Sequence, residues 1–223
     1  MGQLRNTIVF DLDGTLVDTA ADLAAATNQA LEPIGRRPVT KAEVRGMIGG
    51  GFPNLIDQGL RATGGPLEGE MFDEAVAMGR AYYTAHVADL TRPYPDVIET
   101  LVAFAKGGIK MGVCTNKPTA ASQAILDQLG LAKYLPVLVG GDTLPVMKPD
   151  PAMIMAVLDR LDAAAANAVL VGDSETDVAL AKGAGVPVIL VRGGYTLAPV
   201  ETLGADVVVS SFVEIPAALA QLS

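Results

Sequence analysis

The chain has 223 residues, of which 50% are hydrophobic and 18% are charged. This length and composition allow one buried core with a smaller accessory unit and exclude a disordered chain. With 25 acidic against 16 basic residues the formal net charge is −9, which opposes a polyanion, so we expect no nucleic-acid partner. No apolar run reaches the ~18 residues of a membrane-spanning helix, and Asp11 lies too early for a signal peptide to precede it. We therefore expect a cytoplasmic protein with no membrane partner.

Short β-branched runs alternate with alanine-rich helical patterns along most of the chain. Runs that are apolar throughout are typical of parallel strands covered on both faces. The predicted strands are 7–10, 110–114, 137–139, 168–171, 188–191 and 207–209. The predicted helices between and after them are 119–129, 152–161, 176–184 and 213–221. This alternation predicts an α/β fold with a doubly wound parallel sheet.

The alternation stops between the first two strands. Residues 18–90 show helical periodicity but no convincing strand, and a structureless loop of that length is unusual inside a compact domain. Glycine and proline breaks divide the segment into predicted helices at 18–32, 41–48, 54–62 and 70–87. We therefore predict an inserted α-helical domain over 18–90, with residues 1–17 and 91–223 forming the sheet domain.

Polar side chains follow four of the predicted strands, and ligands of open α/β sheets bind at the carboxyl ends of strands. Those side chains, in chain order, are Asp11, Asp13, Thr115, Asn116, Lys148, Asp173 and Asp177. Two carboxylates spaced i, i+2 on a tight turn can serve one phosphoryl group, Asp11 as nucleophile and Asp13 as general acid and base. Thr115 and Lys148 would offset the charge of that group, and Lys148 with a metal would keep Asp11 ionised.

An oxygen-rich group of this kind suits Mg²⁺, which is held by one or two carboxylates and keeps several waters. The predicted ligands are the carboxylates of Asp11 and Asp173 and the main-chain carbonyl of Asp13. Asp177 has three open roles: it binds the metal directly or through water, it orients Lys148, or it stabilises the first turn of the next helix. The single histidine, His86, excludes a multi-histidine zinc site, and we expect Cys114 to be a packed thiol.

Four segments together resemble the motifs of the haloacid dehalogenase superfamily. They are DLDGTL at 11–16, TNK at 115–117, KP at 148–149 and GDSETD at 172–177. The resemblance covers nearly the whole chain and implies a Rossmann-like catalytic core, a helical cap and a phosphoaspartyl intermediate. The segments DTAADL at 18–23 and RGGY at 192–195 resemble the phosphoglycolate phosphatase group within that superfamily. Asp13 argues against dehalogenases, which lack a second aspartate.

The resemblance implies a phosphoric monoester hydrolase for a small phosphorylated metabolite, with 2-phosphoglycolate as the leading substrate. Asn116, with Arg45 and Gly50 of the inserted domain, is expected to bind substrate. Two alternatives stay open for the substrate, a sugar phosphate such as N-acetylmuramate 6-phosphate and pyrophosphate. A third alternative is a non-catalytic module that accepts phosphate on Asp11. The sequence is compatible with a monomer or a homodimer.

Overall fold

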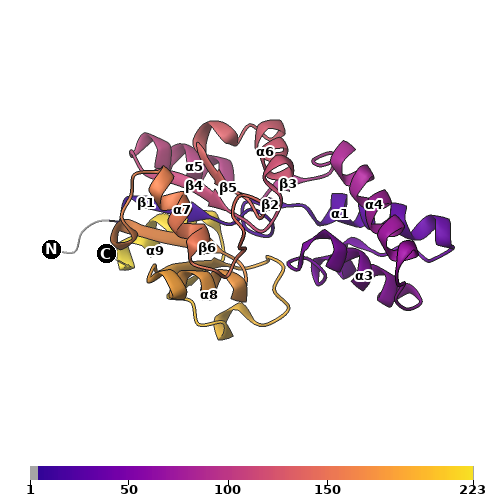
Figure 1. Ribbon diagram of the computed structural model, residues 1–223. Coiled ribbons are helices and arrows are strands. Elements are labelled where there is room, and N and C mark those ends of the chain that lie inside the picture. The colour runs from indigo at the N-terminus through magenta and orange to yellow at the C-terminus, as the bar shows by residue number, and fades with distance from the viewer. Residues whose placement is uncertain (1–4, 223) are drawn as a thin grey trace. The chain divides into compact units, whose positions relative to one another are not determined.

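The structure, a computed structural model, describes residues 5–222 (Figure 1). The chain forms two compact units. One comprises the described parts of Met1–Asp18 and Pro93–Ser223, and is called here the sheet unit. The other, the helical unit, is Thr19–Arg92. None of the described helices combines the length and the apolar character needed to cross a membrane.

A six-stranded parallel sheet forms the centre of the sheet unit. Its strand order is β5-β4-β1-β6-β7-β8. The strands are β1 (Thr7–Phe10), β4 (Lys110–Cys114), β5 (Val137–Val139), β6 (Ala168–Gly172), β7 (Val188–Val191) and β8 (Val207–Val209). All six strands predicted from apolar runs are present, and the α/β parallel-sheet fold is confirmed. Because the chain builds β4 and β5 on one side of β1 and β6 to β8 on the other, the strand order reverses beside β1, where ligands of such sheets bind.

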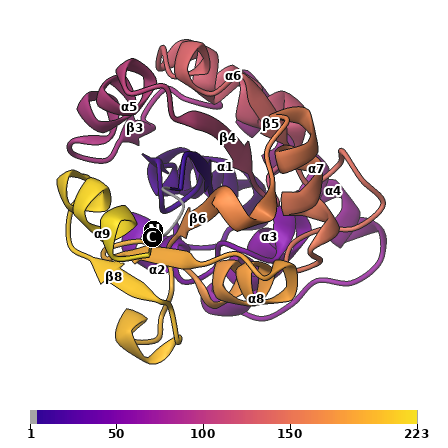
Figure 2. The same cartoon turned by 90° about the vertical axis from the view of Figure 1, so that its left-hand side faces the viewer.

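Alternate residues of the strands point to opposite faces, and helices cover both faces. On one face Val9 of β1 and Leu170 of β6 join a buried cluster with α7 (Ala152–Arg160) and α8 (Glu175–Ala184). Toward the other face, Phe10 stacks on Phe212 with ring centroids 6.3 Å apart. Figure 2 shows α7 and α8 on one side of the sheet, with α5 (Val97–Lys106) and α9 (Ile215–Gln221) on the other. The remaining helix of the sheet unit is α6 (Thr119–Gln128).

Helix α5 was not predicted from the sequence. Pro93 and Pro95 lie just before it, and prolines at this spacing are typical of a break between elements. The helix starts after Asp96, which is in the left-handed conformation with a φ of 64°. This residue makes a turn between the prolines and the helix. Four of its residues are buried, at the i, i+3, i+4 and i+7 positions of an amphipathic helix: Val97, Thr100, Leu101 and Phe104.

The helical unit contains α1 (Ala20–Leu31), α2 (Lys41–Arg45), α3 (Gly51–Thr63) and α4 (Glu70–Ala85). Helix α1 packs against the other three. Gly79 permits the close approach of α4, because a Cβ there would lie 3.0 Å from the main-chain oxygen of Ala26. Helix α2 begins with a capping box of Thr40 and Glu43 but ends at Arg45, earlier than predicted. Outside the six-stranded sheet, β2 (Val17–Asp18) and β3 (Arg92–Pro93) form a two-stranded sheet.

Candidate active site

Asp11 and Lys148 form a buried ion pair at the carboxyl end of β1. Asp11 leaves the central strand with its main-chain N–H donated to Val171 of β6, at 2.9 Å. Its Oδ1 lies 2.7 Å from Lys148 Nζ, and both side chains are no more than 10% exposed. The same ammonium lies 2.8 Å from Asp177 Oδ1. One lysine therefore contacts two carboxylates, one directly after β1 and one in the first turn of α8.

Burial strongly affects the pKa values of Asp11, Asp173 and Lys148. It raises the pKa of Asp11 to about 7, although Lys148 acts in the opposite direction, and the neighbouring Asp177 and Asp13 raise it further. Burial also raises the pKa of Asp173 well above its usual value, with Asp177 and Asp11 adding to the effect. Burial would lower the pKa of Lys148, but Asp11 and Asp177 raise it overall, so the ammonium stays charged. Lys148 by itself does not keep the pKa of Asp11 in the usual range for a carboxylate. Full ionisation of Asp11 therefore requires a further cation.

Asn116 fixes the main chain at Lys148. The Asn116 Oδ1 accepts from Lys148 N at 2.7 Å, and its Nδ2 donates to Lys148 O at 3.1 Å. The preceding residue, Thr115, is buried at the end of β4 and donates its main-chain N–H to Val139 of β5. Lys148 itself lies in the long loop after β5. Asn116 thus connects the end of β4 to the loop that carries Lys148, and its predicted contact with substrate stays a prediction.

Asp177 combines two of the roles that the sequence left open. Its Oδ1 accepts from Lys148 Nζ, as described above. Its Oδ2 accepts from Asp173 N at 3.2 Å, from Ser174 N at 3.1 Å and from Ser174 Oγ at 2.7 Å. Asp177 therefore orients Lys148 and stabilises the first turn of α8 at the same time.

Asp173 is held on both sides of its carboxylate. Its Oδ1 accepts from Thr15 Oγ at 3.0 Å, and its Oδ2 accepts from the main-chain N–H of Tyr195 at 2.6 Å. Gly14, at φ 87°, lies so near that a Cβ there would come within 2.5 Å of Asp173 Oδ2, and a Cβ on Gly194 would come closer still. Glycine is required at both positions because each main chain packs directly on the carboxylate.

Three of these carboxylates form a group that fits a metal ion. One oxygen from each of Asp11, Asp173 and Asp177 lies within 4.8 Å of the others, and all three residues are buried. Hard divalent cations prefer such oxygen ligands. Burial, with added repulsion from neighbouring carboxylates, raises the pKa values of Asp11 and Asp173, and a cation here would favour their ionised forms. The donor set and its electrostatics therefore both fit a bound cation.

Asp13 lies outside that acidic group and pairs instead with Lys117. Lys117 Nζ lies 3.0 Å from Asp13 Oδ1 and 3.1 Å from Oδ2, and the lysine side chain is 6% exposed. The carboxylate of Asp13 is thus engaged by a cation, while the proposed role of its main-chain carbonyl stays a prediction. Lys117 was not singled out from the sequence, although it is the third residue of the TNK segment. Its position two residues after Thr115 was the available signal.

The predicted site residues divide between the two units. Seven belong to the sheet unit, namely Asp11, Asp13, Thr115, Asn116, Lys148, Asp173 and Asp177. Arg45 and Gly50 belong to the helical unit, where Arg45 is the last residue of α2 and Gly50 is the N-cap of α3. Gly50 is exposed, and Arg45 is half-buried. Their predicted contact with substrate stays a prediction.

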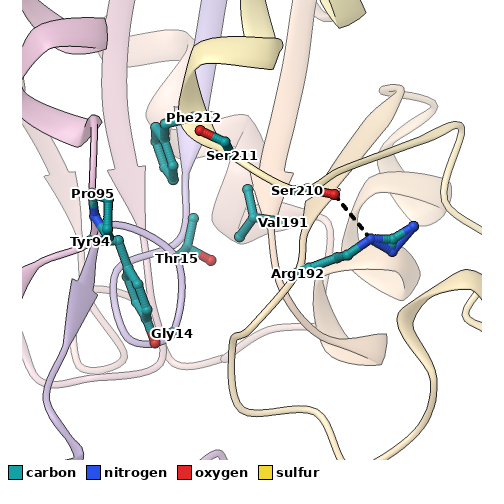
Figure 3. Close-up of a pocket in the computed structure, with 9 residues that line it drawn as sticks. All are labelled: Gly14, Thr15, Tyr94, Pro95, Val191, Arg192, Ser210, Ser211 and Phe212. Atoms are coloured by element: carbon teal, nitrogen blue, oxygen red, sulfur yellow. Dashed lines mark hydrogen bonds between the residues drawn. The ribbon is translucent and has the colours of Figure 1, made fainter.

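A small pocket of about 100 Å³ adjoins the turn after β1 (Figure 3). Its lining comes from that turn, from the residues after β3, from the end of β7 and from the residues after β8. These are Gly14, Thr15, Tyr94, Pro95, Val191, Arg192, Ser210, Ser211 and Phe212. Figure 3 shows Arg192 turned toward Ser210, with which its Nε forms a 3.3 Å hydrogen bond. The pocket contains none of the predicted catalytic side chains, so the candidate active site is the carboxylate and lysine group beside it.

The fold and the site define the general class, a Rossmann-like α/β protein with an acidic site at the carboxyl ends of its strands. Residues 8–191 match the model of a family described as haloacid dehalogenase-like hydrolase. The chain therefore belongs to the haloacid dehalogenase-like hydrolase family.

Individual relatives agree with this membership. The chain is 42% identical over 212 residues to a phosphoglycolate phosphatase of Caulobacter vibrioides, covering 95% of this chain and 90% of the relative. It is 42% identical over 213 residues to a phosphoglycolate phosphatase of Rhodospirillum rubrum, covering 94% and 88%. A crystal structure of a predicted phosphoglycolate phosphatase from Haemophilus somnus superimposes with a TM-score of 0.90 at 30% identity, covering 97% of this chain and 98% of the other.

Proposed function

We propose that this chain is a magnesium-dependent phosphatase that hydrolyses a small phosphomonoester, with 2-phosphoglycolate as its preferred substrate, in the cytoplasm. The observation that carries the proposal is the buried Asp11–Lys148 pair at the end of the central strand, with Asp173 and Asp177 beside it. The two relatives at 42% identity, both named phosphoglycolate phosphatase, support the choice of substrate.

Asp11 would act as the nucleophile. A carboxylate oxygen of Asp11 attacks phosphorus, the ester P–O bond breaks, and Asp13 gives a proton to the departing alkoxide. Asp13, now ionised, takes a proton from the water that attacks the aspartyl phosphate. That second step releases inorganic phosphate and regenerates Asp11. Because Asp13 pairs with Lys117 in the structure, it has to exchange this partner when it protonates a leaving group.

Lys148 and Thr115 would offset the charge of the transferring phosphoryl group. Lys148 is already fixed by Asp11, Asp177 and Asn116, so it needs no rearrangement to serve this role. The residues that would hold Mg²⁺ are Asp11 and Asp173, with the main-chain carbonyl of Asp13 and with Asp177 as a direct or water-mediated ligand. Bound Mg²⁺ neutralises phosphate charge and favours the ionised form of Asp11.

Lys117 offers a reason for choosing a substrate with a carboxylate. Asp13 would stand beside the ester oxygen of the leaving group, and Lys117 Nζ lies 3.0 Å from Asp13. In 2-phosphoglycolate a single methylene separates that ester oxygen from the carboxylate. We assign catalysis to the sheet unit and the role of a cap to the helical unit, whose Arg45 and Gly50 are the alternative partners for the carboxylate.

Steady-state kinetics on a panel of three phosphomonoesters and one phosphoanhydride tests the proposal. The panel contains 2-phosphoglycolate, 2-hydroxyethyl phosphate, N-acetylmuramate 6-phosphate and pyrophosphate, each with Mg²⁺ and after chelation. We expect the highest kcat/KM for 2-phosphoglycolate, and 2-hydroxyethyl phosphate serves as a control of similar size without the carboxylate. A higher value for the sugar phosphate or pyrophosphate would overturn the substrate assignment, and no hydrolysis of any ester would overturn the phosphatase itself.

A further inference from the structure

Tyr195 connects the acidic group to the residue where the chain leaves the sheet unit. Its main-chain N–H donates to Asp173 Oδ2 at 2.6 Å. Its hydroxyl donates to Asp18 Oδ1 at 3.0 Å. The residue is buried, with 7% of its surface exposed. Asp18 is the last residue of β2 and the last residue of the sheet unit before Thr19. One residue therefore joins two separate carboxylates through two different atoms.

The loop that carries Tyr195 wraps directly around Asp173. Gly194 lies so close that a Cβ there would overlap the Asp173 carboxylate. The start of the loop is held by Arg192 N, which donates to Val209 O at 3.0 Å, and its end by Thr196 Oγ, which donates to Glu175 at 3.1 Å. Between these attachments, the Tyr195 hydroxyl donates to Asp18 Oδ1, and the Tyr94 hydroxyl donates to Gly193 O at 3.4 Å. A shift of this loop therefore displaces the main-chain N–H of Tyr195, from which Asp173 accepts a hydrogen bond.

We propose that Tyr195 is a positioning residue for Asp173, and that its bond to Asp18 sets the affinity of the acidic group for a divalent cation. The inference rests on the proposed function only in taking that cation to be Mg²⁺. Mg²⁺ demands near-ideal ligand geometry, so its affinity responds to small displacements of a carboxylate. Removal of a hydrogen-bond partner of a metal ligand typically lowers metal affinity about 10- to 100-fold. The hydroxyl acts one step further away, through the main chain, so we expect about a 3- to 10-fold loss.

Tyr195→Phe is the direct test, because it keeps the ring and the main-chain N–H and removes the hydroxyl that donates to Asp18. Calorimetric titration with Mg²⁺ in the absence of substrate measures the affinity independently of catalysis. We expect about 3- to 10-fold weaker binding, with kcat restored by excess Mg²⁺ and the KM for substrate unchanged at that concentration. Tyr134→Phe, which removes a hydroxyl from the short 3₁₀ helix Ala132–Tyr134 far along the chain, is the matched control and should bind Mg²⁺ like the wild type.

Variants of Asp18 distinguish the effect of losing the Tyr195–Asp18 hydrogen bond from a general loss of stability. Asp18→Asn keeps an oxygen that can accept from the hydroxyl, so it should lose less affinity than Asp18→Ala. The double variant with Tyr195→Phe and Asp18→Ala should lose less than the product of the two single losses, because both remove the same bond. Wild-type affinity in Tyr195→Phe, or an equal loss in Tyr134→Phe, would overturn the inference. Weaker Mg²⁺ binding in Tyr195→Phe would support it even if the wild type hydrolysed no phosphate ester.

Discussion

Asn116 and Lys148 are joined by two hydrogen bonds of opposite direction. The side-chain oxygen of Asn116 accepts from the main-chain N–H of Lys148, and its side-chain nitrogen donates to the main-chain oxygen of the same residue. Thirty-two residues separate the two along the chain. The bonds fix the backbone at Lys148 while its ammonium contacts Asp11 and Asp177. A single amide thus holds the loop that carries Lys148 to the end of β4, beside the nucleophile candidate that follows β1.

This relationship predicts that Asn116→Ala lowers kcat rather than raising KM. Loss of these two partly buried hydrogen bonds should lower the free energy of unfolding by about 1–3 kcal/mol, because each contributes about 0.5–1.5 kcal/mol. Lys148 would then be poorly placed in the transition state, which lowers kcat and kcat/KM together. Urea unfolding and steady-state kinetics measure the two effects. An increase in KM at unchanged kcat would instead establish Asn116 as a substrate-binding residue.

The second prediction concerns recognition of the substrate carboxylate. Lys117→Met keeps the buried aliphatic stem and removes the ammonium beside Asp13. Losing one charge-assisted hydrogen bond costs about 1.5–3 kcal/mol, so kcat/KM for 2-phosphoglycolate should fall about 10- to 150-fold more than that for 2-hydroxyethyl phosphate. Arg45→Ala and Gly50→Val test the helical unit in the same assay. If either of these is selective for the carboxylate substrate and Lys117→Met is not, the carboxylate binds to the helical unit.

Chelation provides the third prediction. Asp11, Asp173 and Asp177 lie within 4.8 Å of one another, and Lys148 alone does not restore the usual pKa of Asp11. Excess EDTA should therefore abolish hydrolysis, and Mg²⁺ should restore it. Ca²⁺ should restore little activity, because its looser coordination does not hold the carboxylates in one geometry. Full turnover in EDTA would show that no divalent cation takes part.

Cys114 provides a prediction about reactivity. The residue is fully buried at the end of β4, and burial raises the pKa of its thiol to about 12, with Lys148 acting in the opposite direction. The reactive thiolate is therefore scarce at neutral pH. A thiol reagent such as dithionitrobenzoate should not react with the native protein at pH 8 and should modify one thiol after denaturation. Rapid reaction of the native protein would contradict this burial.

The sheet was predictable because its strands are short, largely apolar runs bounded by polar residues or glycine. The segments 7–10 and 188–191 are wholly buried, and apolar residues throughout a run are the signal for that environment. Helix α5 escaped prediction because the prolines before it dominate the local pattern. The start of α3 at Gly51 was also missed, since glycine at the first turn of a helix has a poor helix propensity.

The site residues were predictable where a strand end places them, as at Asp11 and Asp173. The hydrogen-bond partners of these residues were harder to predict, because a hydrogen bond between distant segments leaves no periodic pattern in the sequence. Lys117 pairs with Asp13 across 104 positions, and Tyr195 donates to Asp173 across 22. The pKa of Asp11 was equally hidden, since it depends on burial that only the folded chain defines.

The central claim is that Asp11 becomes phosphorylated during turnover, and acid quenching followed by mass spectrometry of proteolytic peptides tests it most directly. Asp13→Asn should form the aspartyl phosphate slowly, because an amide cannot protonate the leaving alkoxide, and should also be impaired in hydrolysing it, because an amide cannot take a proton from water. With 2-phosphoglycolate and Mg²⁺, the peptide containing Asp11 should then carry one phosphoryl group in that variant, and Asp11→Asn should carry none. Phosphate release by Asp11→Asn at the wild-type rate, or a phosphoryl group on any other residue, would contradict the account.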